Sequence, residues 1–447
     1  MKLYSDTKVY IGCPANKNSG GPELLHQLCS QLIQLGINAS MLYTAVDSKF
    51  NPDDPVHDLY KKYHVPYTLA PENSERNVLI APESMTYLLY SYKKTQRVFW
   101  WLSVDNYFKI TINTILNRMA NALSGAMPKI FYFDKADDDI EHWVQSEYAR
   151  QFIKLNGIPE NKIYIVEDYL RQDFLLSAAQ IDLERKENFV AYNPKKGFEI
   201  TRQLINLAPD ISWRPIENMT PAQVQELLAK AKVYIDFGTH PGKDRIPREA
   251  AISGCVVITG LRGAAANSVD INIPDEFKFD ERTANLNHVI EKIRAVFENF
   301  SAAYDKKADY RARILNDKNR FAAEVADAVN MKNLPTKFPT LIAQGFTPQG
   351  YIVASFLAQN QTQFKPAFIT DNNSEMTGEA ITKSHRNFSA LIDGGKSLEI
   401  ISRDDAKFLY HEGRIKKFML FEPTRQEILA LKKFYDPVAK DVMIIER

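Results

Sequence analysis

The chain has 447 residues, of which 45% are hydrophobic and 25% charged, which is typical of a globular protein with two or three domains. Its formal net charge of +1 argues against a dedicated nucleic-acid binder. The three cysteines are far apart and form no CxxC pair, which excludes a cysteine-based zinc site and argues against a disulfide framework. Because we find neither a signal peptide nor a membrane-spanning apolar stretch, we expect a cytoplasmic protein; peripheral contact with the inner membrane face is left open.

Strand-like and helical runs alternate from the start of the chain. A helical pattern follows the turn Gly20-Gly21-Pro22-Glu23 and ends at Gly36. Apolar runs typical of strands lie at 8–13, 39–43, 77–81, 97–102, 129–133 and 162–166. Such alternation predicts a parallel sheet with helices on both faces, which we place in a first domain over residues 1–170.

The same alternation restarts after a polar linker at 180–188. Thr220 and Pro221 are a good N-cap and first-turn pair for the helix that follows them. Strands are predicted at 189–192, 211–214, 232–237 and 255–258, and residues 281–329 look mainly helical. The sequence therefore predicts an α/β fold with two facing Rossmann-like, doubly wound domains, the second over residues 188–330 with trailing helices.

A third region, residues 334–447, reads as a small α/β accessory domain. Its strand-like runs are PAFIT, SLEIIS, KKFMLF and VMIIE, and we find no functional motif in it. Two interpretations stay open. The region is either a module that serves the acceptor or a partner, or a structural extension packed against the second domain.

The segment from 238 to 254 carries the densest chemistry. His240, Lys243 and Arg245 come directly before the N-terminus of a predicted helix, and Gly242 allows a ligand to approach the backbone closely. Free N–H groups and three potential cations at a helix start indicate an anion site, most often for phosphate. Glu249 lies one turn further on the same face, where it could accept hydrogen bonds from sugar hydroxyls. The other interpretation is a solvated basic loop in which Glu249 pairs with Arg245.

Three weaker signals also fall after predicted strands. Gly20 and Gly21 could let a ligand approach the first domain, although the GxGxxG and Walker A patterns are absent. Lys195 and Lys196 would add cations at the first strand of the second domain. Asp105 is a candidate general base, and it is equally well explained as a helix N-cap.

Taken together, these residues resemble a GT-B glycosyltransferase of the family-4-like bacterial type, over about residues 8–330. The resemblance is carried by Gly20-Gly21-Pro22-Glu23, by Tyr192-Asn193-Pro194-Lys195-Lys196-Gly197, and by the run from Asp236 to Val257. In that family two glutamates bracket the donor sugar and ribose. Glu249 matches the second, whereas Pro241 stands at the position of the first. A histidine that is frequent after a first-domain strand is replaced by Ser103-Val104-Asp105.

The resemblance implies transfer of a sugar from a nucleoside diphosphate sugar to a glycan or lipid-linked acceptor, in surface polysaccharide biosynthesis. Donor binding would involve Gly20, Gly21, Lys195, Lys196, His240, Lys243, Arg245 and Glu249, with Asp105 and Glu249 as the catalytic candidates. No cofactor and no metal are expected, because cations and a helix end would neutralise the leaving diphosphate. The alternative is a non-catalytic sugar-nucleotide or glycan-binding subunit that has lost turnover.

Overall fold

The computed structural model describes most of the first 329 residues and selected segments of the rest. The described residues are 1–4, 6–44, 50–120, 131–133, 139–178, 181–281, 285–329, 340–343, 366–370, 380–381, 398–401, 403–412, 418–420 and 442–444. By its contacts the chain divides into two compact units. One comprises residues 1–31, 38–57 and 66–332, and the other comprises 32–37, 58–65 and 333–447.

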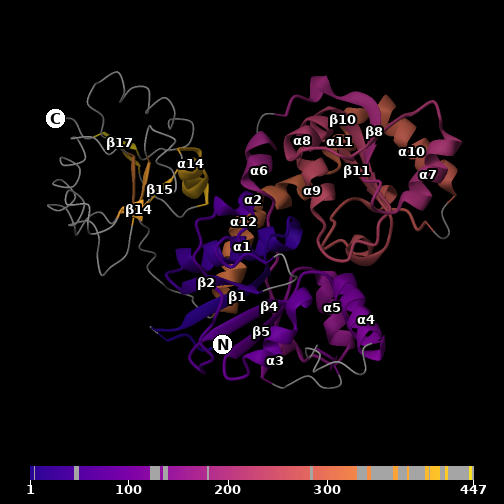
Figure 1. The fold of residues 1–447 in the computed structure, drawn as a ribbon. Helices are drawn as coiled ribbons and strands as arrows, with labels where there is room; N and C mark the ends of the chain where they lie inside the picture. Colours follow the sequence, from indigo (N-terminus) through magenta and orange to yellow (C-terminus); the bar gives the residue numbers. More distant parts are fainter. Residues whose placement is uncertain are drawn as a thin grey trace. The chain divides into compact units, whose positions relative to one another are not determined.

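The first domain is built on a seven-stranded parallel sheet with the strand order β3-β2-β1-β4-β5-β6-β7 (Figure 1). The strands are β1 Lys8–Pro14, β2 Asn38–Thr44, β3 Tyr67–Thr68, β4 Val78–Pro82, β5 Gln96–Trp101, β6 Ile140–Val144 and β7 Ile163–Ile165. The helices are α1 Gly20–Gln34, α3 Tyr87–Ser91, α4 Val104–Ala120 and α5 Glu147–Leu155, whereas α2 Asp58–Lys61 belongs to the other compact unit. Every residue of β4 and nearly every residue of β5 is buried, as expected for central strands covered on both faces.

The second domain contains a four-stranded parallel sheet in the order β11-β10-β8-β9. Its strands are β8 Glu187–Tyr192, β9 Ser212–Pro215, β10 Ala231–Asp236 and β11 Val256–Thr259. Its helices are α7 Phe198–Leu207, α8 Pro221–Lys230, α9 Arg245–Ile252, α10 Leu286–Glu298, α11 Phe300–Asp305 and α12 Ala308–Ala328, with α6 Gln172–Ala178 in the connection from the first domain. Thr220 is the N-cap of α8, as predicted, and it also forms a capping box with Gln223. The two parallel sheets confirm the predicted fold class.

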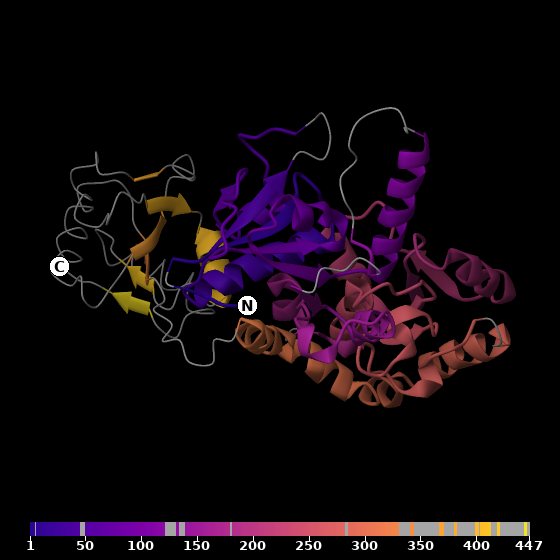
Figure 2. The ribbon, with the colours of Figure 1, turned by 90° about the horizontal axis from the view of Figure 1, so that it is seen from below.

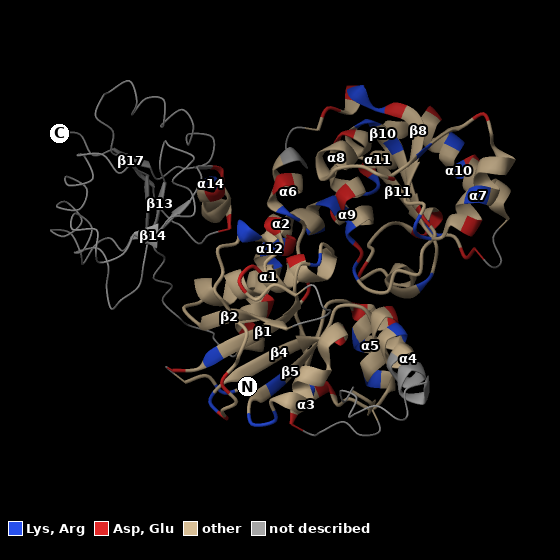
Figure 3. Cartoon of the chain, viewed as in Figure 1, with Lys and Arg blue, Asp and Glu red and all other residues tan. Residues whose placement is uncertain are grey.

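The last helix of the second domain returns to the first. Figure 2 shows the helices that end in α12, in orange, seen from below. Helix α12 contacts both α9 of the second domain and β7 of the first. Because α12 touches a helix of the second domain and a strand of the first, it links the two domains. Figure 3 shows basic and acidic residues mixed around α9 and α12.

One expected strand is absent where the structure describes it. Residues 131–133, the described part of the run 129–133, form no strand. Phe131 is instead fully buried against Phe99 and Trp101, with ring centroids 5.1 and 5.9 Å apart. An apolar loop segment that packs on a sheet has the composition of a buried strand, which explains the wrong prediction.

The third region contains a six-stranded sheet in the order β14-β15-β13-β12-β16-β17. The strands are β12 Thr340–Ala343, β13 Pro366–Thr370, β14 Ala380–Ile381, β15 Leu398–Ile401, β16 Phe418–Leu420 and β17 Val442–Ile444, and β15 is followed by α14 Arg403–His411. Within this unit Phe408 of α14 packs edge-on against Tyr63, at 5.2 Å between ring centroids. Among the described residues, no helix is long and apolar enough to cross a membrane.

Candidate functional site

A cavity of about 710 Å³ lies where the two domains of the first unit meet. Its lining comes from the ends of parallel strands and the helix starts that follow them, which is where doubly wound sheets bind ligands. The residues that line it are Gly20, Gly21, Leu24, Leu102, Ser103, Asn106, Lys109, Gln145, Asp168, Lys195, Lys196, Gly197, Asp236, Thr239, Pro241, Gly242, Lys243, Asp244, Arg245, Ile246, Pro247 and Glu249.

Helix α9 presents two charged side chains to this cavity. Arg245 is its first residue, and Glu249 lies one turn further along. Nη2 of Arg245 is buried, and within the described part of the chain it has no hydrogen-bond partner. Since a buried guanidinium N–H without a partner is costly, this atom is a strong candidate to bind an anionic group.

The carboxyl group of Glu249 has an unusual electrostatic environment. The residue is 9% exposed. Burial raises the pKa of Glu249 above its ordinary value, although Arg245 and Arg171 oppose the increase. A carboxyl group that is buried at the edge of a cavity is well suited to accept hydrogen bonds from the hydroxyl groups of a ligand.

Lys243 and Arg248, in contrast, are occupied by a buried ion-pair network. The Lys243 ammonium forms an ion pair with Glu167 and lies 3.2 Å from Asp317 on α12. The Arg248 guanidinium lies 2.7 Å from Asp168 and 3.4 Å from Asp317. Lys243 therefore lines the cavity with its charge already paired, and its role in donor binding stays a prediction.

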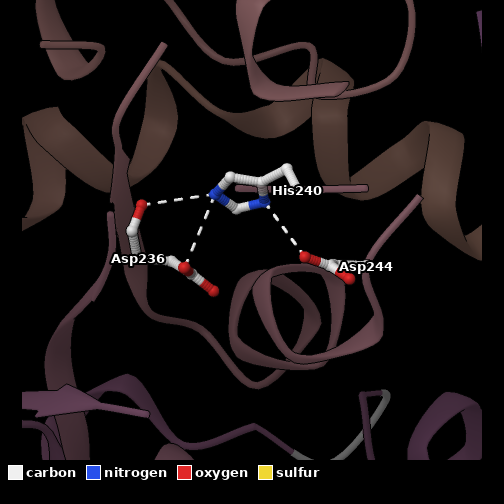
Figure 4. A group of neighbouring side chains, drawn as sticks. All are labelled: Asp236, His240 and Asp244. Carbon is white, nitrogen blue, oxygen red and sulfur yellow. Dashed lines mark hydrogen bonds and ion pairs between the residues drawn. The ribbon is translucent and has the colours of Figure 1, made fainter. Parts of the chain in front are cut away.

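His240 is not among the residues that line the cavity. Figure 4 shows its ring between the side chains of Asp236 and Asp244. It is fully buried, with Nε2 3.5 Å from Asp236 and Nδ1 3.2 Å from Asp244. Burial alone would lower the pKa of His240, but the two carboxylates raise it above its ordinary value. A backbone φ of 44° places His240 in the left-handed region, so the packing around it holds a strained turn in place.

The same three side chains could in principle offer ligands to a metal ion, since their ligand atoms lie within 4.8 Å of one another. Two features oppose this. The raised pKa of His240 favours the imidazolium, which cannot bind a cation. The Lys196 ammonium lies 2.7 Å from the same Asp244 oxygen that faces His240. The two carboxylates are therefore neutralised by protein cations.

The first-domain wall of the cavity is built mainly from a helix start and a loop. Gly20 and Gly21 begin α1, and a Cβ atom on Gly20 would lie 3.6 Å from Cδ of Arg245. Glycine therefore leaves open space beside the Arg245 side chain. Asp105 does not line the cavity, whereas its neighbours Ser103 and Asn106 do. Asp105 lies in the first turn of α4, where its carboxylate faces a favourable helix dipole.

The loop ahead of α9 touches the first domain directly. The Val104 N–H donates to the Pro241 carbonyl at 3.0 Å, and the Lys243 N–H donates to the Gln145 side chain at 3.0 Å. A Cβ atom on Gly242 would lie 2.5 Å from the Leu102 carbonyl oxygen. Only glycine therefore permits this approach of the two backbones.

Sequence reasoning missed several lining residues of the first domain and the connection. Ser103, Asn106 and Asp168 follow predicted strands of the first sheet, and Gln145 follows β6, a strand that was not predicted. Their positions at strand ends could have identified them, since the carboxyl ends of parallel strands meet at one edge. Lys109 would have followed as the residue one turn beyond Asn106 on α4.

No protein-family profile and no curated protein matches the chain. Several solved structures resemble it. HepE from Anabaena, in complex with UDP and glucose, is 13% identical and covers 72% of this chain and 98% of its own, with a TM-score of 0.48. A glycosyltransferase from Rickettsia africae is 14% identical, with 74% and 100% coverage and a TM-score of 0.45. Sucrose-phosphate synthase from Thermosynechococcus elongatus is 11% identical, with 72% and 98% coverage and a TM-score of 0.49.

Proposed function

We propose that the chain is a glycosyltransferase that moves a sugar from a nucleoside diphosphate sugar to a hydroxyl-bearing glycan or lipid-linked acceptor. The observation that carries the proposal is the pair Arg245 and Glu249, which α9 presents to one cavity on successive turns. A diphosphate needs cations and free N–H groups, and the sugar beside it needs hydrogen-bond acceptors. This helix offers both within one turn.

The diphosphate would lie between the start of α9 and the start of α1. Arg245 supplies a guanidinium with a buried atom available, and exposed Lys195 lines the same cavity. The N–H groups at Gly20 and Gly21 add the positive end of a second helix. Negative charge that develops on the leaving diphosphate would be stabilised by these fixed groups, which is the largest single contribution in many transfer reactions.

Glu249 would hold hydroxyl groups of the ribose or the donor sugar. The positive charge of Arg245 lies near the Glu249 carboxyl group and offsets its repulsion of the donor phosphates. Glu249 would therefore bind hydroxyl groups next to the diphosphate. Pro241 occupies the place where the resembling family has the first of its two glutamates, and it lines the cavity. The donor would therefore be contacted by one glutamate, Glu249, instead of two.

A non-catalytic sugar-nucleotide-binding subunit remains the rival function. The position of Asp105 outside the cavity favours it, because Asp168, a first-domain carboxylate that does line the cavity, is already paired with Arg248. Both proposals predict donor binding, and only the first predicts turnover. We therefore separate binding from transfer in the test.

The test is a binding and turnover assay on the full chain with a panel of nucleoside diphosphate sugars. We expect one donor to raise the melting temperature by mass action and to be hydrolysed slowly or transferred to an acceptor glycan. The variants Arg245→Ala and Glu249→Gln should each weaken donor binding about 10- to 100-fold, the worth of one charge-assisted hydrogen bond. Arg202→Ala, on α7 outside the cavity lining, is the matched control.

Each result has a distinct meaning. Donor binding without turnover across all acceptors would favour the rival subunit. Unchanged donor affinity in both cavity variants, with the protein folded, would contradict the site assignment.

A further inference from the structure

Asp270 is a buried carboxylate of the second domain that contacts the first domain. It follows β11 and the short 3-10 helix Gly263–Ala266. Its Oδ1 accepts the Glu147 N–H at 2.8 Å, and its Oδ2 accepts the Tyr148 N–H at 2.9 Å. Asp270 is 1% exposed and does not line the cavity, and none of the chemistry proposed above uses it.

The two N–H groups that Asp270 binds belong to the first two residues of α5. The first N–H groups of a helix have no partner within the helix, and a carboxylate beside them is electrostatically favourable. Ser146, the N-cap of α5, accepts only the Ala149 N–H, at 3.1 Å. The start of α5 is therefore capped partly from its own domain, by Ser146, and partly from the other domain, by Asp270.

Burial makes the Asp270 carboxylate expensive to keep. Besides the two N–H groups of α5, the Asn267 amide donates to its Oδ2 at 2.9 Å. Burial still raises the pKa of Asp270, although these hydrogen bonds favour the ionised form. Packing between two domains does not require a buried charge, and an apolar side chain would avoid this cost. The hydrogen bonds to α5 are what the carboxylate specifically provides.

The same start of α5 also contacts the loop ahead of α9. Gln145, which directly precedes Ser146, lines the cavity. Its Oε1 accepts the Lys243 N–H at 3.0 Å, and its Nε2 lies 3.4 Å from the Lys243 carbonyl oxygen, to which it donates. Lys243 lies two residues before Arg245 on the chain. The segment 145–148 of the first domain therefore contacts the second domain at two places.

These two places are fixed to each other within the second domain. The Ala264 N–H donates to the His240 carbonyl at 2.8 Å, which joins the segment 263–270 to the loop ahead of α9. Gly263 has a φ of 56°, and a Cβ atom on it would lie 2.1 Å from the same His240 oxygen. Only glycine allows this approach. The start of α5 thus binds one connected surface of the second domain.

We propose that Asp270 is a positioning residue that holds the first-domain wall of the cavity in register with the loop ahead of α9. The inference rests on the proposed function and adds a residue that aligns the two walls for transfer. Asp270 would act through α5 and would touch neither substrate. Its loss should lower kcat far more than donor affinity, because Arg245 and Glu249 both remain on α9.

The first test breaks the contact from the second domain. Asp270→Asn keeps the size of the side chain, but its single acceptor oxygen cannot replace the two carboxylate oxygens. We expect the kcat for transfer to fall about 10- to 100-fold, the effect of a small misplacement, while donor affinity measured without acceptor stays within about threefold. Small-angle X-ray scattering of the full chain should show a larger radius of gyration than in the wild type.

The second test breaks the same contact from the first domain. Glu147→Pro removes the N–H group that Oδ1 of Asp270 accepts, and proline is compatible with the first position of a helix. Ser146 before it already has the extended backbone that a following proline requires, with φ −147° and ψ 156°. We expect the same changes in kcat and in scattering as for Asp270→Asn. Glu147→Ala is the matched control, because it loses the same side chain and keeps the N–H group.

Ser146→Ala controls for a general loss of stability in α5. It removes the cap that lies within the first domain and leaves both hydrogen bonds to Asp270 in place. The melting temperature should fall as the cap is lost. The kcat and the radius of gyration should stay close to those of the wild type.

Two outcomes would overturn the inference. Asp270→Asn and Glu147→Pro could keep the kcat and the radius of gyration of the wild type. Alternatively, Ser146→Ala or Glu147→Ala could lose as much kcat as they do, which would reduce Asp270 to a role in the stability of α5. Failure of the proposed function looks different, because the wild-type chain would then bind no sugar nucleotide or transfer no sugar. The scattering comparison would still decide whether Asp270 holds the two domains together.

Discussion

The two walls of the cavity are built in different ways. The second-domain wall consists of charged side chains on α9 and on the turn at Lys195 and Lys196, and buried counter-charges fix the loop ahead of α9. The first-domain wall is formed by glycines, a short loop and the amide of Asn106. Lys109 and Asp168 also line the first-domain side, and Asp168 is already paired with Arg248. Arg245 has a buried N–H group without a partner among the described residues, so we propose that the donor diphosphate lies against the second-domain wall.

The same contrast exists within α9, and it gives the largest expected effect. Arg248 is 1% exposed and paired with Asp168 and Asp317, whereas Arg245 faces the cavity. Arg248→Ala removes the ion pair of the buried Asp168 carboxylate, while Asp317 keeps Lys243, so we expect about 3–5 kcal/mol of destabilisation. Arg245→Ala should change the free energy of unfolding by less than about 1 kcal/mol. Urea denaturation of both variants measures this, and equal losses would contradict the division of roles.

The contact between the walls depends on one glycine. Gly242→Ala places a Cβ atom 2.5 Å from the Leu102 carbonyl oxygen and 2.8 Å from Oε1 of Gln145. We expect either about 1–3 kcal/mol of strain or a separation of the two backbones. In both cases transfer activity should fall strongly. Gly36→Ala, with nothing within 4 Å of the new Cβ atom but a positive φ, is a control for general glycine effects. Full transfer activity in Gly242→Ala would show that this contact is not needed.

The turn ahead of α9 should respond to pH through His240. Its folded pKa is raised, so its stabilising effect is complete below the ordinary value of about 6.5 and is lost as the pH rises through the folded pKa. His240→Asn tolerates the left-handed backbone but cannot carry the charge. The free energy of unfolding should therefore fall more between pH 6 and pH 9 in the wild type than in this variant, by about 1.4 kcal/mol per unit of pKa shift. If the free energy of unfolding changed with pH in the same way in the wild type and in His240→Asn, His240 would not be the cause of the pH dependence.

Removal of divalent cations should have the smallest effect. Lys196 and the His240 imidazolium already neutralise Asp244, so we expect a chelator to change turnover by less than about twofold. Loss of activity that added magnesium or manganese restores would contradict this prediction.

Much of the fold was predictable because its signals are local. Alternating strands and helices, the Thr220 capping box and the helical stretch after 285 all appear in the sequence as periodicity and caps. The charge state of the site residues was not predictable. Lys243 and Arg245 look equivalent in sequence. In the fold, Glu167 and Asp317 come from distant parts of the chain and form ion pairs with Lys243, whereas Nη2 of Arg245 has no hydrogen-bond partner among the described residues.

The most direct measurement is a crystal structure of the chain with a nucleoside diphosphate sugar bound. We predict diphosphate oxygens within hydrogen-bond distance of the Arg245 guanidinium and of the N–H groups that begin α1, with ribose or sugar hydroxyls on Glu249. A donor bound elsewhere in the molecule, or bound in this cavity with its phosphates away from Arg245, would contradict the assignment of the charged wall to the donor.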